Sequence, residues 1–158
     1  MIGKKIYVLL IACLSVLYGC HAGKNKKDPV HWFSYETTPC FGKCPTFSLE
    51  VRSDGFMKID KKENLDQIGV FTRQLSKAEL NQLIENETAM NFCSLKPVYG
   101  GGVSDLPSTF IRKKCGEKVK SVQLLMNYPP EVVAFTELID QWANSGDWKE
   151  FGANESSY

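Results

Sequence analysis

Two cysteines four positions apart form the most reactive motif in this chain. Cys40 and Cys44 flank Phe41-Gly42-Lys43, and a proline stands on the outer side of each cysteine. Thiols at this spacing can form a disulfide, exchange disulfides with another thiol, or bind a soft metal ion such as Cu(I). Phe41, Gly42 and Lys43 would then form the tip of a closed ring, and we treat them as a candidate functional loop.

For metal binding the sequence shows too few ligands near the two cysteines, and for redox exchange their spacing is unusual. A zinc site needs four ligands, so Cys93 and Cys115 would have to lie beside the pair. The order C-x-x-x-C-P resembles the copper-binding stretch of the Sco-type assembly factors, but those use a distal histidine, whereas His21 and His31 both precede the motif. Thiol exchange usually uses C-x-x-C, one residue shorter. We expect no metal and no cofactor, and keep thiol exchange or metal handling as the alternative function.

The first 19 residues have the composition of a secretory signal. Two lysines precede a mostly apolar run over residues 6–17, which is too short to span a bilayer as a helix. The end of this run, Leu17-Tyr18-Gly19-Cys20, resembles a bacterial lipobox. That resemblance implies cleavage before Cys20 and attachment of lipid to it, with simple secretion as the alternative.

Residues 20–30 are mostly small, polar or charged, and they predict a flexible tether behind the lipidated Cys20. We expect a protein of the bacterial cell envelope that is anchored to a membrane through Cys20, either periplasmic or associated with the outer membrane. Loss of the two leader lysines leaves 17 basic and 18 acidic side chains. This near-neutral balance gives no broad attraction for nucleic acid, so we expect no nucleic-acid partner.

The remainder of the chain alternates between two hydrophobic periods. Period-two patterns predict strands, at residues 46–52, 56–60, 68–73, 108–115 and 118–125, with 31–36 as a weaker candidate. Asp54-Gly55 is typical of the tight turn of a hairpin. Ser76-Lys77-Ala78-Glu79 is a capping box and starts one helix. Pro129-Pro130 precedes a second, amphipathic helix.

This order of elements predicts a fold class and a domain organisation. We expect a single α+β domain over residues 31–152, with an antiparallel sheet of about five strands and both helices packed on one face (β-β-β-α-β-β-α). Residues 153–158 are predicted to be a frayed tail. Trp32, Phe33 and Tyr35 could form a binding face, but packing under the sheet is the stronger prediction.

Several short sequence motifs along this domain together resemble those of a known family. The most specific runs from Thr38 to Phe47. The others are Asp54-Gly55, Leu75-Ser76 with Glu79, Asp105-Leu106-Pro107, Pro129-Pro130, Leu138-Ile139-Asp140 and Trp148. Together they resemble a bacterial family of uncharacterised secreted and lipid-anchored domains with a P-C-F-G-x-C-P pattern. The resemblance covers roughly residues 32–149. It implies a fold and an envelope location but no activity, because the family has none assigned.

Four cysteines of the domain would lie in an oxidising compartment, which favours two disulfides. The residues alone allow three pairings. The resemblance favours Cys40–Cys44 with Cys93–Cys115, because the first pair belongs to the shared string and the second lies outside it. Gly42 fits a tight ring, since such a ring can need a backbone angle closed to other residues.

The remaining candidate residues are few. Asp105 is placed with the functional loop, but a catalytic acid would need a partner that the sequence does not offer. His31 is the only histidine of the domain, which argues against a serine-histidine-acid hydrolase. We therefore expect an envelope lipoprotein whose domain is not an enzyme. It would bind or scaffold an envelope protein or small ligand of unknown identity.

Overall fold

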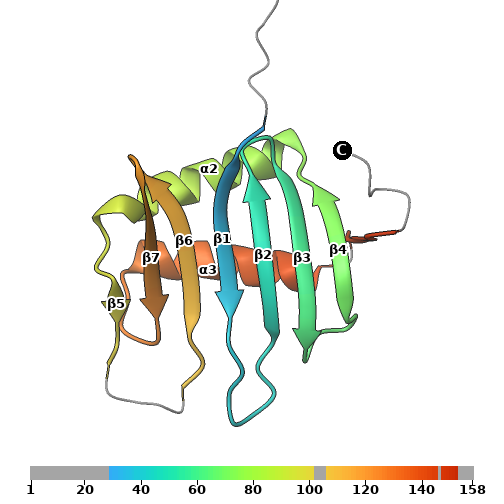
Figure 1. Cartoon of the computed structure of the whole chain (residues 1–158), viewed down its shortest axis with the longest axis horizontal. Helices are drawn as coiled ribbons and strands as arrows, with labels where there is room; N and C mark the ends of the chain where they lie inside the picture. Colours follow the sequence, from blue (N-terminus) through green and yellow to red (C-terminus); the bar gives the residue numbers. More distant parts are fainter. Residues whose placement is uncertain (1–28, 102–105, 146, 153–158) are drawn as a thin grey trace, which may run out of the picture.

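The computed structural model describes residues 29–101, 106–145 and 147–152. These residues form a mixed α+β fold built on one eight-stranded sheet (Figure 1). The order across the sheet is β5-β7-β6-β1-β2-β3-β4-β8. The strands are β1 (His31–Thr37), β2 (Thr46–Arg52), β3 (Phe56–Glu63), β4 (Gly69–Gln74), β5 (Val98–Tyr99), β6 (Thr109–Cys115), β7 (Lys118–Leu124) and β8 (Lys149–Glu150).

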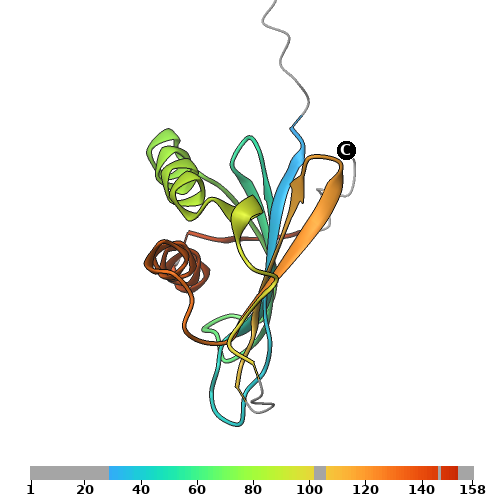
Figure 2. The ribbon, with the colours of Figure 1, turned by 90° about the vertical axis from the view of Figure 1, so that its left-hand side faces the viewer.

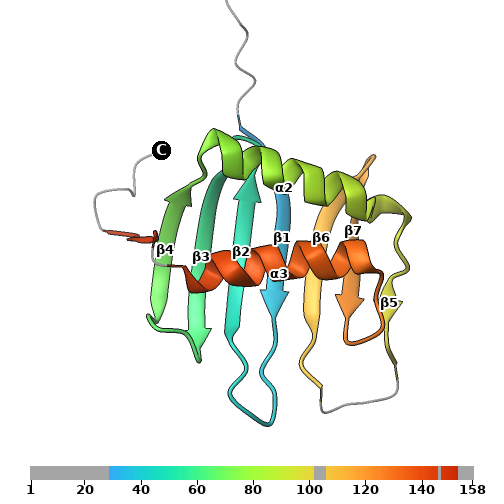
Figure 3. The same ribbon diagram turned by 180° about the vertical axis from the view of Figure 1, so that it is seen from behind.

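Two helices lie on the same face of this sheet (Figure 2). They are α2 (Lys77–Met90) and α3 (Pro130–Asn144), and both run across the strands (Figure 3). A short 3-10 helix, η1 (Phe92–Ser94), follows α2. None of the helices in the described ranges is long and apolar enough to cross a membrane.

The alternation of side chains along each strand decides which of them reach the helices. On β2, Phe47, Leu49 and Val51 are buried, as their period-two pattern predicts, while Ser48 and Glu50 lie on the uncovered face. Neighbouring strands repeat this division, so one face of the sheet is apolar and the other polar. The core contains Phe33, Tyr35, Met57, Ile59, Ile111 and Val122 from the sheet and Leu83, Val132, Phe135 and Ile139 from the helices.

The expectation of about five strands in an antiparallel sheet is wrong on both counts. The sheet has eight strands and is mixed, because β5 pairs with β7 in parallel. β5 and β8 contain only two residues each, which is too short for an alternating pattern to show in the sequence. Both are defined by the neighbouring strand that they meet, so only the tertiary fold reveals them.

Local signals at the element ends are confirmed. Ser76 accepts a hydrogen bond from the Glu79 amide, and the Glu79 carboxylate accepts one from the Ser76 amide at 2.8 Å, which completes the capping box of α2. Gly55 in the β2–β3 turn has φ +82°, a conformation that glycine adopts without strain. Pro130 begins α3.

Arg73 joins several elements at the β4–β8 edge of the sheet. It is a buried residue of β4, and its guanidinium group contacts the Glu79 carboxylate of α2. It also donates to Ser145 Oγ at 3.2 Å and to Asp147 Oδ2 at 3.3 Å. Because those two residues follow α3 and lead into β8, one side chain ties both helices to the sheet edge. These contacts give Arg73 a structural role.

Candidate functional site

Cys40 and Cys44 are joined in a disulfide within the β1–β2 connection. This connection projects from the end of the sheet opposite to the end at which the chain enters β1 (Figure 1). The second disulfide joins Cys93 of η1 to Cys115 at the end of β6. Of the three pairings that four cysteines allow, the structure therefore contains Cys40–Cys44 with Cys93–Cys115.

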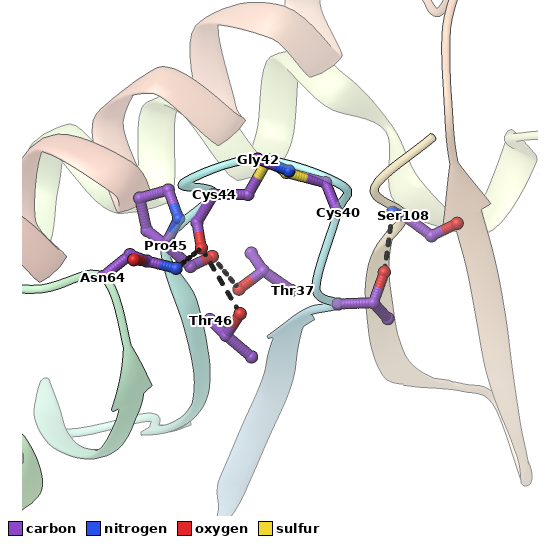
Figure 4. Close-up of a disulfide and its surroundings, with 9 residues drawn as sticks. Thr37, Cys40, Gly42, Cys44, Pro45, Thr46, Asn64 and Ser108 are labelled. Carbon is purple, nitrogen blue, oxygen red and sulfur yellow. Dashed lines mark hydrogen bonds between the residues drawn. A yellow bond between two sulfur atoms is a disulfide. The ribbon is translucent and has the colours of Figure 1, made fainter. Parts of the chain in front are cut away.

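The base of the disulfide loop is held by hydrogen bonds on three sides (Figure 4). The Thr37 hydroxyl donates to the Pro45 carbonyl at 2.9 Å and accepts from the Phe47 amide at 3.0 Å. From the β3–β4 turn, the Asn64 side-chain amide donates to the Cys44 carbonyl at 3.0 Å. These contacts close the loop across its own base and onto a neighbouring turn.

The third side of the loop is bound to the segment that leads into β6. The Thr38 amide donates to the Ser108 carbonyl at 3.0 Å, and the Ser108 amide donates to the Thr38 hydroxyl at 2.9 Å. This reciprocal pair joins segments that are 70 residues apart in sequence. A ring closed by a disulfide and tied to two other segments loses little further entropy when it binds a partner.

The tip of the loop points away from the protein. Phe41 is 93% exposed, and Gly42 and Lys43 are exposed as well. The expectation that Gly42 needs a backbone angle closed to other residues is wrong, because its φ is not in the left-handed region. Its amide instead donates to Cys40 Sγ at 3.2 Å. A Cβ at this position would meet only Cys40 Sγ, at an ordinary 3.7 Å, so neither the backbone angle nor the available space requires glycine here.

A small cleft of about 270 Å³ lies beside the base of the loop. Its lining comes from four parts of the chain that are far apart in sequence: the loop, the start of β6, the segment between β7 and α3, and the last two turns of α3. The side chains that matter for its chemistry are Thr38, Ser108, Tyr128, Asp140 and Asn144. They offer hydroxyl, amide and carboxylate groups, without a histidine among the described lining residues.

Asp140 is the charged residue of this cleft, and it is held by a buried tyrosine. Tyr35 is fully buried in β1, and its hydroxyl donates to Asp140 Oδ1 at 3.0 Å. Burial is the main cause that raises the pKa of Tyr35 well above 10.0, and the nearby Asp140 charge raises it further. The phenol therefore remains a hydrogen-bond donor throughout the physiological pH range.

The pKa of Asp140 is raised as well. Desolvation by the surrounding protein is the largest cause, although Asp140 is an exposed residue. The hydrogen bond from Tyr35 lowers the pKa of Asp140, and the nearby Glu137 charge raises it. The carboxyl group of Asp140 is thus harder to ionise than that of a fully solvated aspartate.

Two residues singled out from the sequence, Asp105 and Cys20, lie outside the described residues. The aromatic run at the start of the domain lies in β1, where Phe33 and Tyr35 are core residues and Trp32 packs against the core. Among the described residues there is no cluster of three histidine, cysteine, aspartate or glutamate side chains that could hold a metal ion.

Sequence reasoning missed the pairing that defines the charge of the cleft, Asp140 held by Tyr35. Asp140 was included in the shared Leu138-Ile139-Asp140 string, but no role followed from it. The signal that could have found it is a carboxylate directly beside the apolar stripe of an amphipathic helix, where a solvated charge is not expected. Tyr35 gave no such signal, because a tyrosine in a buried strand is ordinary.

Comparison with known proteins places this fold in a family. The family profile named domain of unknown function (DUF6438) matches residues 31–143, from the first residue of β1 almost to the end of α3. The chain belongs to this family. No curated protein matches it. The DUF6438 match contains the disulfide loop and Asp140, and it ends one residue before Asn144 of the cleft.

Proposed function

We propose that this DUF6438 protein is a bacterial envelope lipoprotein whose domain is a non-catalytic binding module. The tip of its disulfide loop would be the contact surface. The observation that carries the proposal is the 93% exposure of Phe41 on a loop tied down on three sides. A large aromatic side chain in water is energetically unfavourable, while aromatic residues on rigid loops are typical anchors of protein interfaces.

The rest of the loop supports the same function. Lys43 is exposed next to Cys44 and adds a charged contact at the rim, where charges direct association more than they add affinity. The disulfide preorganises Phe41, Gly42 and Lys43, so that binding would order few additional bonds. The loop also points away from the end of the sheet where the chain enters, which would leave it accessible on an anchored protein (Figure 1).

Photo-crosslinking from the loop tip tests this function. We expect a photoreactive phenylalanine analogue at position 41 to give a discrete adduct in intact envelopes, and the same analogue at Val119 to give none. Val119 is a suitable control because it is 72% exposed but lies in the β6–β7 hairpin. Excess wild-type protein should compete for the adduct, and the Phe41→Ala protein about tenfold less well. Equal competition by the two proteins would refute the proposed contact.

Two observations favour the alternative function, thiol exchange at Cys40 and Cys44. The Gly42 amide donates to Cys40 Sγ, and a hydrogen bond of this kind would stabilise a thiolate after reduction. Both cysteines are also partly exposed. Exchange would therefore be possible at the surface, although the position of Phe41 favours binding.

Intact-mass analysis of protein extracted from membranes decides both the anchor and this alternative. We expect a lipid mass on a chain that begins at Cys20, and its absence from a Cys20→Ser variant. Alkylation before reduction should leave Cys40 and Cys44 unmodified, and alkylation after reduction should modify both. Free or partly oxidised thiols in the untreated sample would instead favour thiol exchange, and an unmodified Cys20 would exclude the lipid anchor.

A further inference from the structure

We propose that the cleft beside the disulfide loop binds a positively charged side chain of the partner, an ammonium or guanidinium group. The inference rests on the proposed binding function, because the cleft and the loop lie at the same end of the molecule. It adds the chemical class of the ligand, which the exposed loop alone does not define.

The charge of the cleft is the first observation. Among the described residues that line it, Asp140 is the only charged one, and there is no lysine or arginine to neutralise it. A carboxylate in a partly apolar cleft without a counter-charge is stabilised by a cation that binds beside it. The cleft therefore discriminates in favour of positive groups and against carboxylates and phosphates.

The end of α3 adds to the same negative potential. Asp140 and Asn144 lie in the last two turns of this helix, whose C-terminal carbonyl groups carry a partial negative charge. The last turn has no basic residue, which is the usual compensation at this place. The Asn144 side-chain amide donates to the Asp140 backbone carbonyl at 2.8 Å, so its oxygen remains an acceptor.

Shape and orientation also fit one cationic side chain. The Tyr35 hydroxyl donates a hydrogen bond to Asp140 Oδ1 and so fixes the orientation of the carboxylate. The second carboxylate oxygen can still accept a hydrogen bond from a ligand. Phe47, Leu125 and Tyr128 provide apolar lining for an aliphatic stem. A volume of about 270 Å³ lies just below the range of pockets for whole small-molecule ligands. The cleft thus suits a single residue of a larger partner.

Two probes with similar stems, of which only one ends in an ammonium group, test the inference. Nα-acetyl-lysine amide and Nα-acetyl-norleucine amide have similar stems, and each is titrated into the full-chain protein in detergent while the amide resonances of Thr109 and Asn144 are followed by NMR. We expect the lysine probe to bind about tenfold or more tightly than the norleucine probe. Equal affinities, including no binding by either probe, would overturn the proposed charge selectivity.

Variants assign the selectivity to one carboxylate. Asp140→Asn removes the charge but keeps an acceptor for Tyr35, and it should abolish the preference for lysine. Glu131→Gln is the matched control, because Glu131 is an exposed carboxylate in the first turn of the same helix. It should leave the preference unchanged. A lysine preference that survives in Asp140→Asn would show that the cation binds elsewhere.

The pH dependence supplies a second readout. Lysine binding should weaken as the pH falls through the raised pKa of Asp140, because the protonated carboxyl group no longer attracts a cation. The titratable groups that act on Asp140 are Tyr35 from β1 and Glu137 from α3, and Tyr128 lines the same cleft. Tyr35→Phe removes a hydrogen bond that lowers the pKa of Asp140. This variant should therefore shift the loss of binding to higher pH, and an unchanged profile would contradict the role of Tyr35.

The results separate this inference from the proposed function. If the crosslink from position 41 is specific but lysine and norleucine probes bind alike, the binding module stands and the cationic ligand fails. If the lysine probe binds through Asp140 but position 41 gives no specific adduct, the cleft is a site and the loop is not the contact surface. Each outcome supports or refutes one of the two statements independently.

Discussion

Lys61 is the least expected residue of the core. It is only 4% exposed, and it lies on the helix-covered face of β3 with its ammonium group 5.5 Å from the ring centre of Phe71 and 5.6 Å from that of Trp148. Within the described residues it forms no ion pair. Burial lowers the pKa of Lys61, and the Asp66 charge opposes this only in part.

This environment predicts that Lys61→Met stabilises the protein near neutral pH, by about 1 kcal/mol, since methionine keeps the stem without the charge. Because the folded pKa is below the unfolded value of 10.5, the unfolded state binds more protons between the two values. Wild-type stability should therefore rise with pH in that window and approach that of the variant. Urea unfolding at pH 7 and pH 10 measures both effects.

Lys62→Met is the control for this prediction, because Lys62 is the next residue along β3 but is exposed on the polar face. Its free energy of unfolding should differ little from that of the wild type at either pH. A Lys61→Met protein that is less stable than Lys62→Met at pH 7 would show that the contacts of the ammonium group with the two rings outweigh the cost of its burial.

At the scale of elements, the two disulfides should contribute differently to stability. Cys93–Cys115 joins η1 to β6 across a separation of 22 residues, and Cys40–Cys44 closes a separation of four. Loop-closure entropy predicts that Cys93→Ser/Cys115→Ser lowers the free energy of unfolding by about 3.4 kcal/mol, and Cys40→Ser/Cys44→Ser by about 2 kcal/mol. Chemical unfolding of the two double variants compares them. A larger loss from the short ring would mean that the loop supports the core as well as the site.

The elements that the sequence predicts are those with a local cause. β2, the β2–β3 turn and the start of α2 depend on alternation, on Gly55 and on Ser76 with Glu79, and each of these signals lies within a few residues. β5 and β8 depend on partners elsewhere in the chain and could not be predicted. The same division holds at the site. The cysteine loop is visible as a local string, whereas the cleft requires β1 and α3 to place Tyr35 against Asp140, 105 residues apart.

The whole molecule has two distinct ends. The chain enters β1 at one end of the sheet, and the Cys40–Cys44 loop and the cleft lie at the other (Figure 1). β1 is an inner strand, with β2 and β6 on either side. A single strand thus separates the point of entry from the proposed contact surface, and it does so through the middle of the sheet.

That central position has a mechanical consequence. If the tether is pulled, the force acts along β1, which forms antiparallel ladders with both β2 and β6. The hydrogen bonds of such ladders lie perpendicular to the strands. A pull along the strand therefore strains many of them together, whereas a pull across the strand from one end would open them one at a time. If the proposed anchor and partner exist, β1 would carry a load between them along its own axis before the domain unfolds.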